Sequence, residues 1–137
     1  MIGIVIVAHG GLAAEYLSAL EHVVGKGAGT RAIAIATDDN RAAKQSEINA
    51  AVDAVDTGDG VVVVTDMFGG TPSNLAIAAC RHPDRRVLYG ANLPMLVKLA
   101  KARNGSLDDA VAAALDAGRK YINCADEYLA RSSAVTH

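Results

Sequence analysis

The sequence predicts an α/β fold built on an open, mostly parallel, doubly wound sheet with helices on both faces. Short apolar runs rich in β-branched residues alternate with longer segments in which apolar residues recur every three or four positions. The runs at residues 2–8 and 61–65 are almost continuously apolar, as expected for strands buried on both faces of a parallel sheet. A chain of 137 residues, 51% of them hydrophobic, fits a single domain covering residues 1–137.

The first two units each pair a strand with a helix. After the strand at residues 2–8, a Gly-Gly pair at residues 10–11 breaks the apolar run, and apolar residues at helical spacing then continue to Val24. A second strand at residues 31–36 precedes another helix, which the glycine-containing turn at residues 57–60 ends. Capping oxygens for this second helix come from Asp38, Asp39 and Asn40.

The third and fourth units follow the same pattern. The run at residues 61–65 is the most strand-like in the chain, and Thr-Pro at residues 71–72 opens a helix that reaches about Cys80. Residues 86–89 begin a fourth strand, and residues 92–94 start the helix after it. Strands that alternate with helices imply an open, mostly parallel sheet with helices on both faces.

The C-terminal part predicts one more helix and an ambiguous segment. Residues 104–105 end the preceding helix, and residues 106–109 are typical of a capping box for a helix that runs to near Gly118. Residues 121–124 fit either a short antiparallel fifth strand or the continuation of a helix, and the sequence leaves both open.

Two polar residues follow strands that we expect to be neighbours. His9 comes directly after the first strand and Asp66 directly after the third. With strand order 2-1-3-4, the order reverses between these strands, and such sheets bind ligands beyond the carboxyl ends at this reversal. An aspartate that accepts from one imidazole nitrogen leaves the other with a free lone pair, as a nucleophilic histidine requires. We therefore expect His9 and Asp66 to form a catalytic pair.

The segment Gly-Gly-Thr-Pro-Ser at residues 69–73 predicts an anion site. The first N–H groups of a helix are unsatisfied, and the helix dipole favours negative charge there. Gly69 and Gly70 let the backbone approach a phosphate closely, while the hydroxyls of Thr71, as N-cap, and of Ser73 donate to its oxygens. Because the chain has neither a Walker lysine motif nor G-x-G-x-x-G after the first strand, a phosphoryl group carried by the protein fits better than a bound nucleotide.

Composition argues against several other classes of protein. A net charge of −2 without a basic stripe, with aromatics at 4%, argues against a nucleic-acid partner. No apolar run approaches the roughly 18 residues that span a bilayer, and residues 2–8 do not resemble a signal peptide. Cys80 and Cys124 lack CxxC spacing, so neither a disulfide framework nor a zinc site is indicated. We expect a cytoplasmic protein with no direct membrane insertion.

Three segments of the chain carry a resemblance to a known family. They are residues 5–10 (VIVAHG), residues 65–74 (TDMFGGTPSN) and residues 92–96 (NLPML). These segments resemble the mannose-type (mannose/fructose/sorbose) IIA component of the bacterial phosphoenolpyruvate-dependent sugar phosphotransferase system. The resemblance keeps order and spacing over roughly residues 1–100.

The resemblance implies a phosphocarrier, a protein-histidine phosphotransferase component. His9 would accept a phosphoryl group on Nε2 from the phosphohistidine of the carrier HPr, while Asp66 holds Nδ1 and Thr71 hydrogen-bonds the phosphate. The group would then pass to a IIB component during sugar uptake, with no metal, nucleotide or other cofactor. Members of the family form homodimers that exchange a C-terminal strand; that strand is not evident in this sequence, but we still expect a homodimer.

Several alternatives to the phosphocarrier hypothesis remain open. The chain could be a regulatory phosphorylation sensor of an incomplete phosphotransferase system, a phosphocarrier that feeds a dihydroxyacetone kinase, or a binding module that uses the His9 crevice without accepting phosphate. A hydrolase with His9 as base and Ser73 as nucleophile lacks the G-x-S-x-G elbow. A metal site made by His9, Asp66 and His82 matches no ligand spacing.

Overall fold

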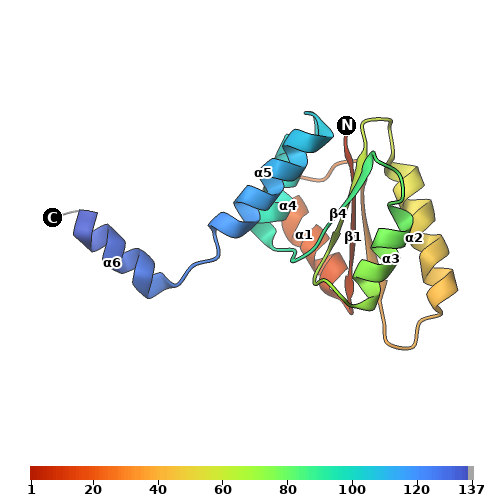
Figure 1. The fold of residues 1–137 in the computed structure, drawn as a ribbon, viewed down its shortest axis with the longest axis horizontal. Coiled ribbons are helices and arrows are strands. Elements are labelled where there is room, and N and C mark those ends of the chain that lie inside the picture. Colours follow the sequence, from red (N-terminus) through yellow and green to blue (C-terminus); the bar gives the residue numbers. More distant parts are fainter. Residues whose placement is uncertain (136–137) are drawn as a thin grey trace.

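The computed structural model describes residues 1–135 and has the predicted α/β architecture (Figure 1). Strands and helices alternate through the first four units, and two more helices follow. The strands are β1 (Gly3–His9), β2 (Thr30–Ile35), β3 (Val61–Thr65) and β4 (Arg85–Leu88). The helices are α1 (Leu12–Val24), α2 (Arg41–Val55), α3 (Thr71–Ala79), α4 (Leu93–Ala102), α5 (Leu107–Lys120) and α6 (Ala125–Val135).

The sheet has the predicted strand order β2-β1-β3-β4, and every pair is parallel. Chain order reverses between β1 and β3, the two central strands. In this register His9 lies opposite Ile35 at the end of β2, and Val7 lies opposite Thr65 at the end of β3. The loops that follow β1, β2 and β3 therefore meet at one edge of the sheet, where the predicted site residues lie.

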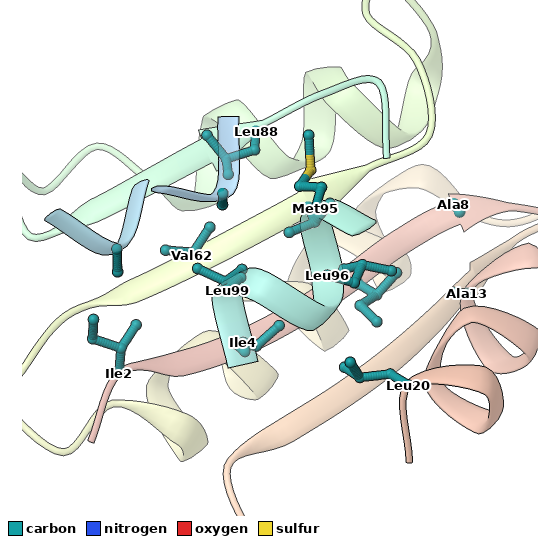
Figure 2. Packing of buried hydrophobic residues seen from close by; sticks show 14 residues of the cluster. Ile2, Ile4, Ala8, Ala13, Leu20, Val62, Leu88, Met95, Leu96 and Leu99 are labelled. Carbon is teal, nitrogen blue, oxygen red and sulfur yellow. The ribbon is translucent and has the colours of Figure 1, made fainter. Parts of the chain in front are cut away.

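The alternation of side chains along the strands divides the core into two layers. Ile4 and Ile6 of β1 face α1, α4 and α5, whereas Val5 and Val7 face α2 and α3. Figure 2 shows the first layer, in which Leu96 and Leu99 of α4 pack over the strands. Full burial of such aliphatic side chains contributes roughly 1.5–3 kcal/mol each. This packing fixes the strand ends on which the site is built.

Hydrogen bonds to N-cap side chains define where three of the helices begin. Asn40, Asn92 and Ser106 each accept a hydrogen bond from the backbone N–H three residues later, at the starts of α2, α4 and α5. The Asn92 side chain also donates to the carbonyl oxygen of Gly118 at 2.9 Å, which ties α4 to α5. Satisfying these otherwise unpaired N–H groups stabilises each helix start by about 1 kcal/mol.

The C-terminal segment forms neither of the two structures that the sequence left open. Tyr121 is a turn residue, and the chain then runs without regular structure into α6, so the sheet has four strands within residues 1–135. Two physical features favour the start of a new helix here. The Asn123 side chain accepts from the Cys124 N–H at 2.8 Å, and Asp126 and Glu127 place negative charge in the first turn of α6, where the helix dipole favours it. Figure 1 shows α6 standing apart from the sheet.

No helix within residues 1–135 is both long enough and apolar enough to cross a bilayer.

Candidate functional site

His9 and Asp66 are in direct contact at the edge between β1 and β3. The Asp66 Oδ2 lies 2.7 Å from His9 Nδ1 and accepts a second hydrogen bond, at 3.1 Å, from the His9 backbone N–H. Oδ1 accepts from the Met67 N–H at 3.0 Å. An ionised carboxylate only accepts hydrogen bonds, so Nδ1 carries the proton in the neutral imidazole and Nε2 keeps a lone pair. The His9 side chain is 47% exposed and that of Asp66 only 11%.

The environment of Asp66 keeps its carboxyl group ionised. Burial opposes ionisation, but hydrogen bonds from the His9 side chain and the His9 backbone N–H, with the attraction of the imidazole, outweigh it and lower the pKa of Asp66. Asp66 is therefore a carboxylate at neutral pH and remains an acceptor for the His9 ring.

The glycines of the loop after β3 have different roles. Gly70 has an ordinary φ of −96°, but a Cβ at this position would lie 3.1 Å from His9 Cε1 and 3.3 Å from Nε2. Gly69 has a φ of +94°, in the left-handed region that favours glycine. Gly69 therefore turns the chain, and Gly70 lets the backbone lie directly against the imidazole ring.

The Ser73 hydroxyl is used within this loop. It accepts from the Gly69 N–H at 2.9 Å and donates to the Gly70 carbonyl at 3.0 Å, and Ser73 is fully buried. A buried hydroxyl with both partners inside the loop is poorly placed to contact a phosphate or to act as a nucleophile. Its evident role is to hold the loop against α3.

Helix α3 begins one residue earlier than the sequence predicts. Gly70, in extended conformation, is the N-cap, and Thr71 rather than Pro72 is the first helical residue. Hydrogen bonds of the Ser73 hydroxyl hold the backbone of Gly69 and Gly70 against the helix end. The N-cap therefore lies one residue closer to the N-terminus than predicted. The first intrahelical bond runs from the Asn74 N–H to the Gly70 carbonyl, so the N–H groups of Gly70, Thr71 and Ser73 precede it. This positive helix end lies beside His9.

A pocket of about 540 Å³ opens beside His9 on the side of α2 and α3. Thr71 is exposed and lines it. Two cationic residues of α2, Arg41 and Lys44, line the same pocket, and our sequence interpretation missed them. A signal for them was present: β2 neighbours β1, so the first turn of the helix after β2 must border the crevice that holds His9.

The other histidines lie away from this constellation. His22 is exposed in the last turn of α1, and His82 is exposed in the loop before β4, where its Nδ1 lies 3.7 Å from an Asp84 oxygen. Within residues 1–135, no three His, Cys, Asp or Glu side chains gather in a way that could hold a metal ion. The structure thus brings together His9, Asp66, Gly70 and Thr71, and leaves His82 outside.

The fold and the site together define a doubly wound α/β protein with a carboxylate-bound histidine at the reversal of strand order, beside a helix N-terminus. Within this class the chain belongs to the EIIA-man family, described as the PTS system fructose IIA component, whose family model matches residues 3–115.

Individual relatives agree with this assignment. The chain is 33% identical over 122 residues to the PTS system mannose-specific EIIAB component of Escherichia coli strain K12; the match covers 87% of this chain but only 38% of the length of that relative. Among solved structures, phosphotransferase system component EIIA from Streptococcus agalactiae aligns with a TM-score of 0.80 and 29% identity, over 90% of this chain and 97% of that one. The mannose/sorbose-specific IIA subunit from Enterococcus faecalis aligns with a TM-score of 0.80 and 25% identity, over 90% and 93%.

Proposed function

We propose that this chain is a phosphocarrier that holds a phosphoryl group on His9 Nε2. The observation that carries the proposal is the contact of 2.7 Å between His9 Nδ1 and Asp66, which leaves Nε2 free of the carboxylate, in a half-exposed side chain that lies against Gly70 at the start of α3. In the transfer, the Nε2 lone pair forms a bond to phosphorus while the phosphorus–nitrogen bond of the donor's phosphohistidine breaks. The donor ring carries a proton on its other nitrogen, so it leaves as a neutral imidazole.

Asp66 and α3 would have distinct roles in this reaction. Once Nε2 carries the phosphoryl group and Nδ1 its proton, the imidazole ring bears positive charge, which the Asp66 carboxylate stabilises. The N–H groups at the start of α3 and the hydroxyl of Thr71 would hold the phosphoryl oxygens. Gly69 and Gly70 permit this close approach, and Ser73 would support the loop rather than bind phosphate.

Membership of the family supports the proposed partners. An HPr-like phosphocarrier is the proposed donor, and a IIB component or a regulatory target is the proposed acceptor. The name of the E. coli relative joins an A and a B component, which supports a B component as acceptor. We also propose a homodimer and a cytoplasmic location. Exposed apolar side chains at Ile122, Tyr128 and Leu129, on and before α6, support a surface that another subunit covers.

The test of the proposed function is the intact mass of the protein after incubation with phosphoenolpyruvate, enzyme I and HPr, without exposure to acid. We expect a gain of about 80 Da, one phosphoryl group. A control lacking HPr should show no gain. If the protein stays unmodified while HPr itself is phosphorylated, the proposed carrier function is wrong.

Gly70→Ala tests the close approach of the backbone to His9. The new Cβ would lie 3.1 Å from Cε1 and 3.3 Å from Nε2, so the ring must shift by some tenths of an ångström. We expect phosphorylation by HPr to slow about ten- to a hundredfold, because a reacting atom moved out of its productive position reacts more slowly. Folding should be preserved, since a φ of −96° suits alanine.

Gly27→Ala is the matched control for this prediction, because a Cβ at Gly27 meets nothing within 4 Å and the residue has no left-handed φ. Initial rates of phosphorylation and melting temperatures of both variants check the prediction. Equal rates in Gly70→Ala and the wild type would show that this contact does not affect the reaction.

A further inference from the structure

The pocket beside His9 is larger than a phosphoryl group requires. Its volume is about 540 Å³, whereas a phosphoryl group has only four heavy atoms. One part of its lining comes from the loop after β2 and the first turn of α2, and this part carries the cationic side chains Arg41 and Lys44. Part of the pocket therefore remains open to another group, and its lining holds the carboxylate of Asp39 as well as the two cations.

The two cations differ in their surroundings. Lys44 Nζ lies 3.0 Å from a Glu47 carboxylate oxygen and 4.0 Å from one of Asp39, so its charge is largely compensated within the chain. Arg41 is exposed and makes no ion pair or side-chain hydrogen bond with any residue in the described range 1–135. Its guanidinium is thus the uncompensated positive charge on this part of the lining.

The position of Arg41 does not serve the stability of its helix. Arg41 is the first residue of α2, and no acidic residue lies in the first turn of that helix. A positive charge at a helix N-terminus opposes the helix dipole. An exposed cation that opposes the dipole and has no carboxylate partner within residues 1–135 is available to a partner outside the chain.

We infer that Arg41 is a specificity-determining residue that binds an acidic side chain, Asp or Glu, of the protein that phosphorylates His9. The inference rests on the proposed function. A donor protein must bring its phosphoryl group to Nε2, and its surface then covers the mouth of the pocket that Arg41 lines. The planar guanidinium makes paired hydrogen bonds to a carboxylate, which fixes the orientation of the docked protein.

Steady-state phosphorylation of His9 by phospho-HPr, with the HPr concentration varied, tests this inference with the Arg41→Glu variant. We expect KM for phospho-HPr to rise about tenfold at low salt while kcat changes less than about twofold, because the charge acts on encounter and docking rather than on the reacting atoms. The difference from wild type should shrink as salt is added. Glutamate at this position suits the helix dipole, so α2 should remain folded, which circular dichroism checks.

Arg31→Glu is the matched control, because it makes the same change of net charge at an exposed residue. Arg31 pairs with Val5, four residues before the pairing of His9 with Ile35, or about 13 Å along the strands. A rise in KM confined to Arg41→Glu supports the inference. An unchanged KM, an equal rise in Arg31→Glu, or a fall in kcat alone would overturn it while leaving the proposed function intact. Failure of the wild type to be phosphorylated by active phospho-HPr would overturn both.

Discussion

His9→Ala is expected to abolish phosphoryl transfer, lowering the rate by more than about 10⁴-fold, as removal of a reacting nucleophile does. The variant should show no gain of about 80 Da under conditions in which the wild type is fully modified. The reason is geometric: one ring nitrogen of His9 is hydrogen-bonded to a carboxylate, and the other lies near Gly70 at a helix N-terminus. Alanine offers no lone pair at that place.

The matched control for His9→Ala is His22→Ala, because His22 is an exposed histidine in α1 away from the site. This control should be phosphorylated like the wild type. Folding is not expected to confound the result, because the His9 side chain is 47% exposed and its loss leaves no large cavity. Retention of the mass gain in His9→Ala would place the phosphoryl group elsewhere and refute the assigned acceptor.

The strands of the sheet and the contact between His9 and Asp66 could be predicted, because the local sequence pattern indicates the strands and their parallel order brings the two residues together. The run Val61–Thr65 has only apolar β-branched residues before its final threonine, and it forms β3 with the predicted bounds. Parallel pairing in the order 2-1-3-4 then requires the residues at the carboxyl ends of β1 and β3 to be neighbours. The contact between His9 and Asp66 follows from that topology, whatever the separation in sequence.

Other features depend on side-chain conformations that a sequence pattern does not encode. The hydroxyl of Ser73 has the same chemistry whether it faces a phosphate or the loop, and only the structure shows that it binds Gly69 and Gly70. The role of Gly70 depends on the position of the His9 ring rather than on its own backbone angles. Arg41 was missed because our interpretation followed two strands of the crevice and left out the loop after β2.

Replacing Asp66 is the second change with a large expected effect. In Asp66→Ala the His9 ring loses its acceptor at 2.7 Å, so tautomer and orientation are no longer fixed. We expect the rate of phosphorylation to fall about 10²–10⁴-fold, the range seen when the orienting partner of a catalytic histidine is removed. Rapid-quench measurement of phosphohistidine formation would determine this factor. A rate within about threefold of wild type would rule out an orienting role for Asp66.

Asp66→Asn separates orientation from charge. Oδ2 receives two donors from His9 and Oδ1 only one from Met67, so the amide oxygen of asparagine should turn toward His9; its NH₂ group then faces the Met67 N–H, which loses its acceptor. The variant would keep the Nδ1–H tautomer but lose the negative charge that stabilises the phosphorylated ring. We therefore expect a smaller loss of rate than in Asp66→Ala. An equal loss in both variants would mean that charge, not orientation, dominates.

The same pair of proteins, wild type and Asp66→Asn, should show a pH-dependent difference in stability. The folded-state pKa of Asp66 is lowered below its unfolded value of about 4, so ionised Asp66 stabilises the fold fully above that value. This contribution is lost as the pH falls through the lower, folded-state pKa. Urea unfolding should thus find a constant gap between the two proteins from neutral pH down to about pH 5, and a shrinking gap below pH 4. A gap that is unchanged in acid would show that the His9 hydrogen bonds do not depend on the charge of Asp66.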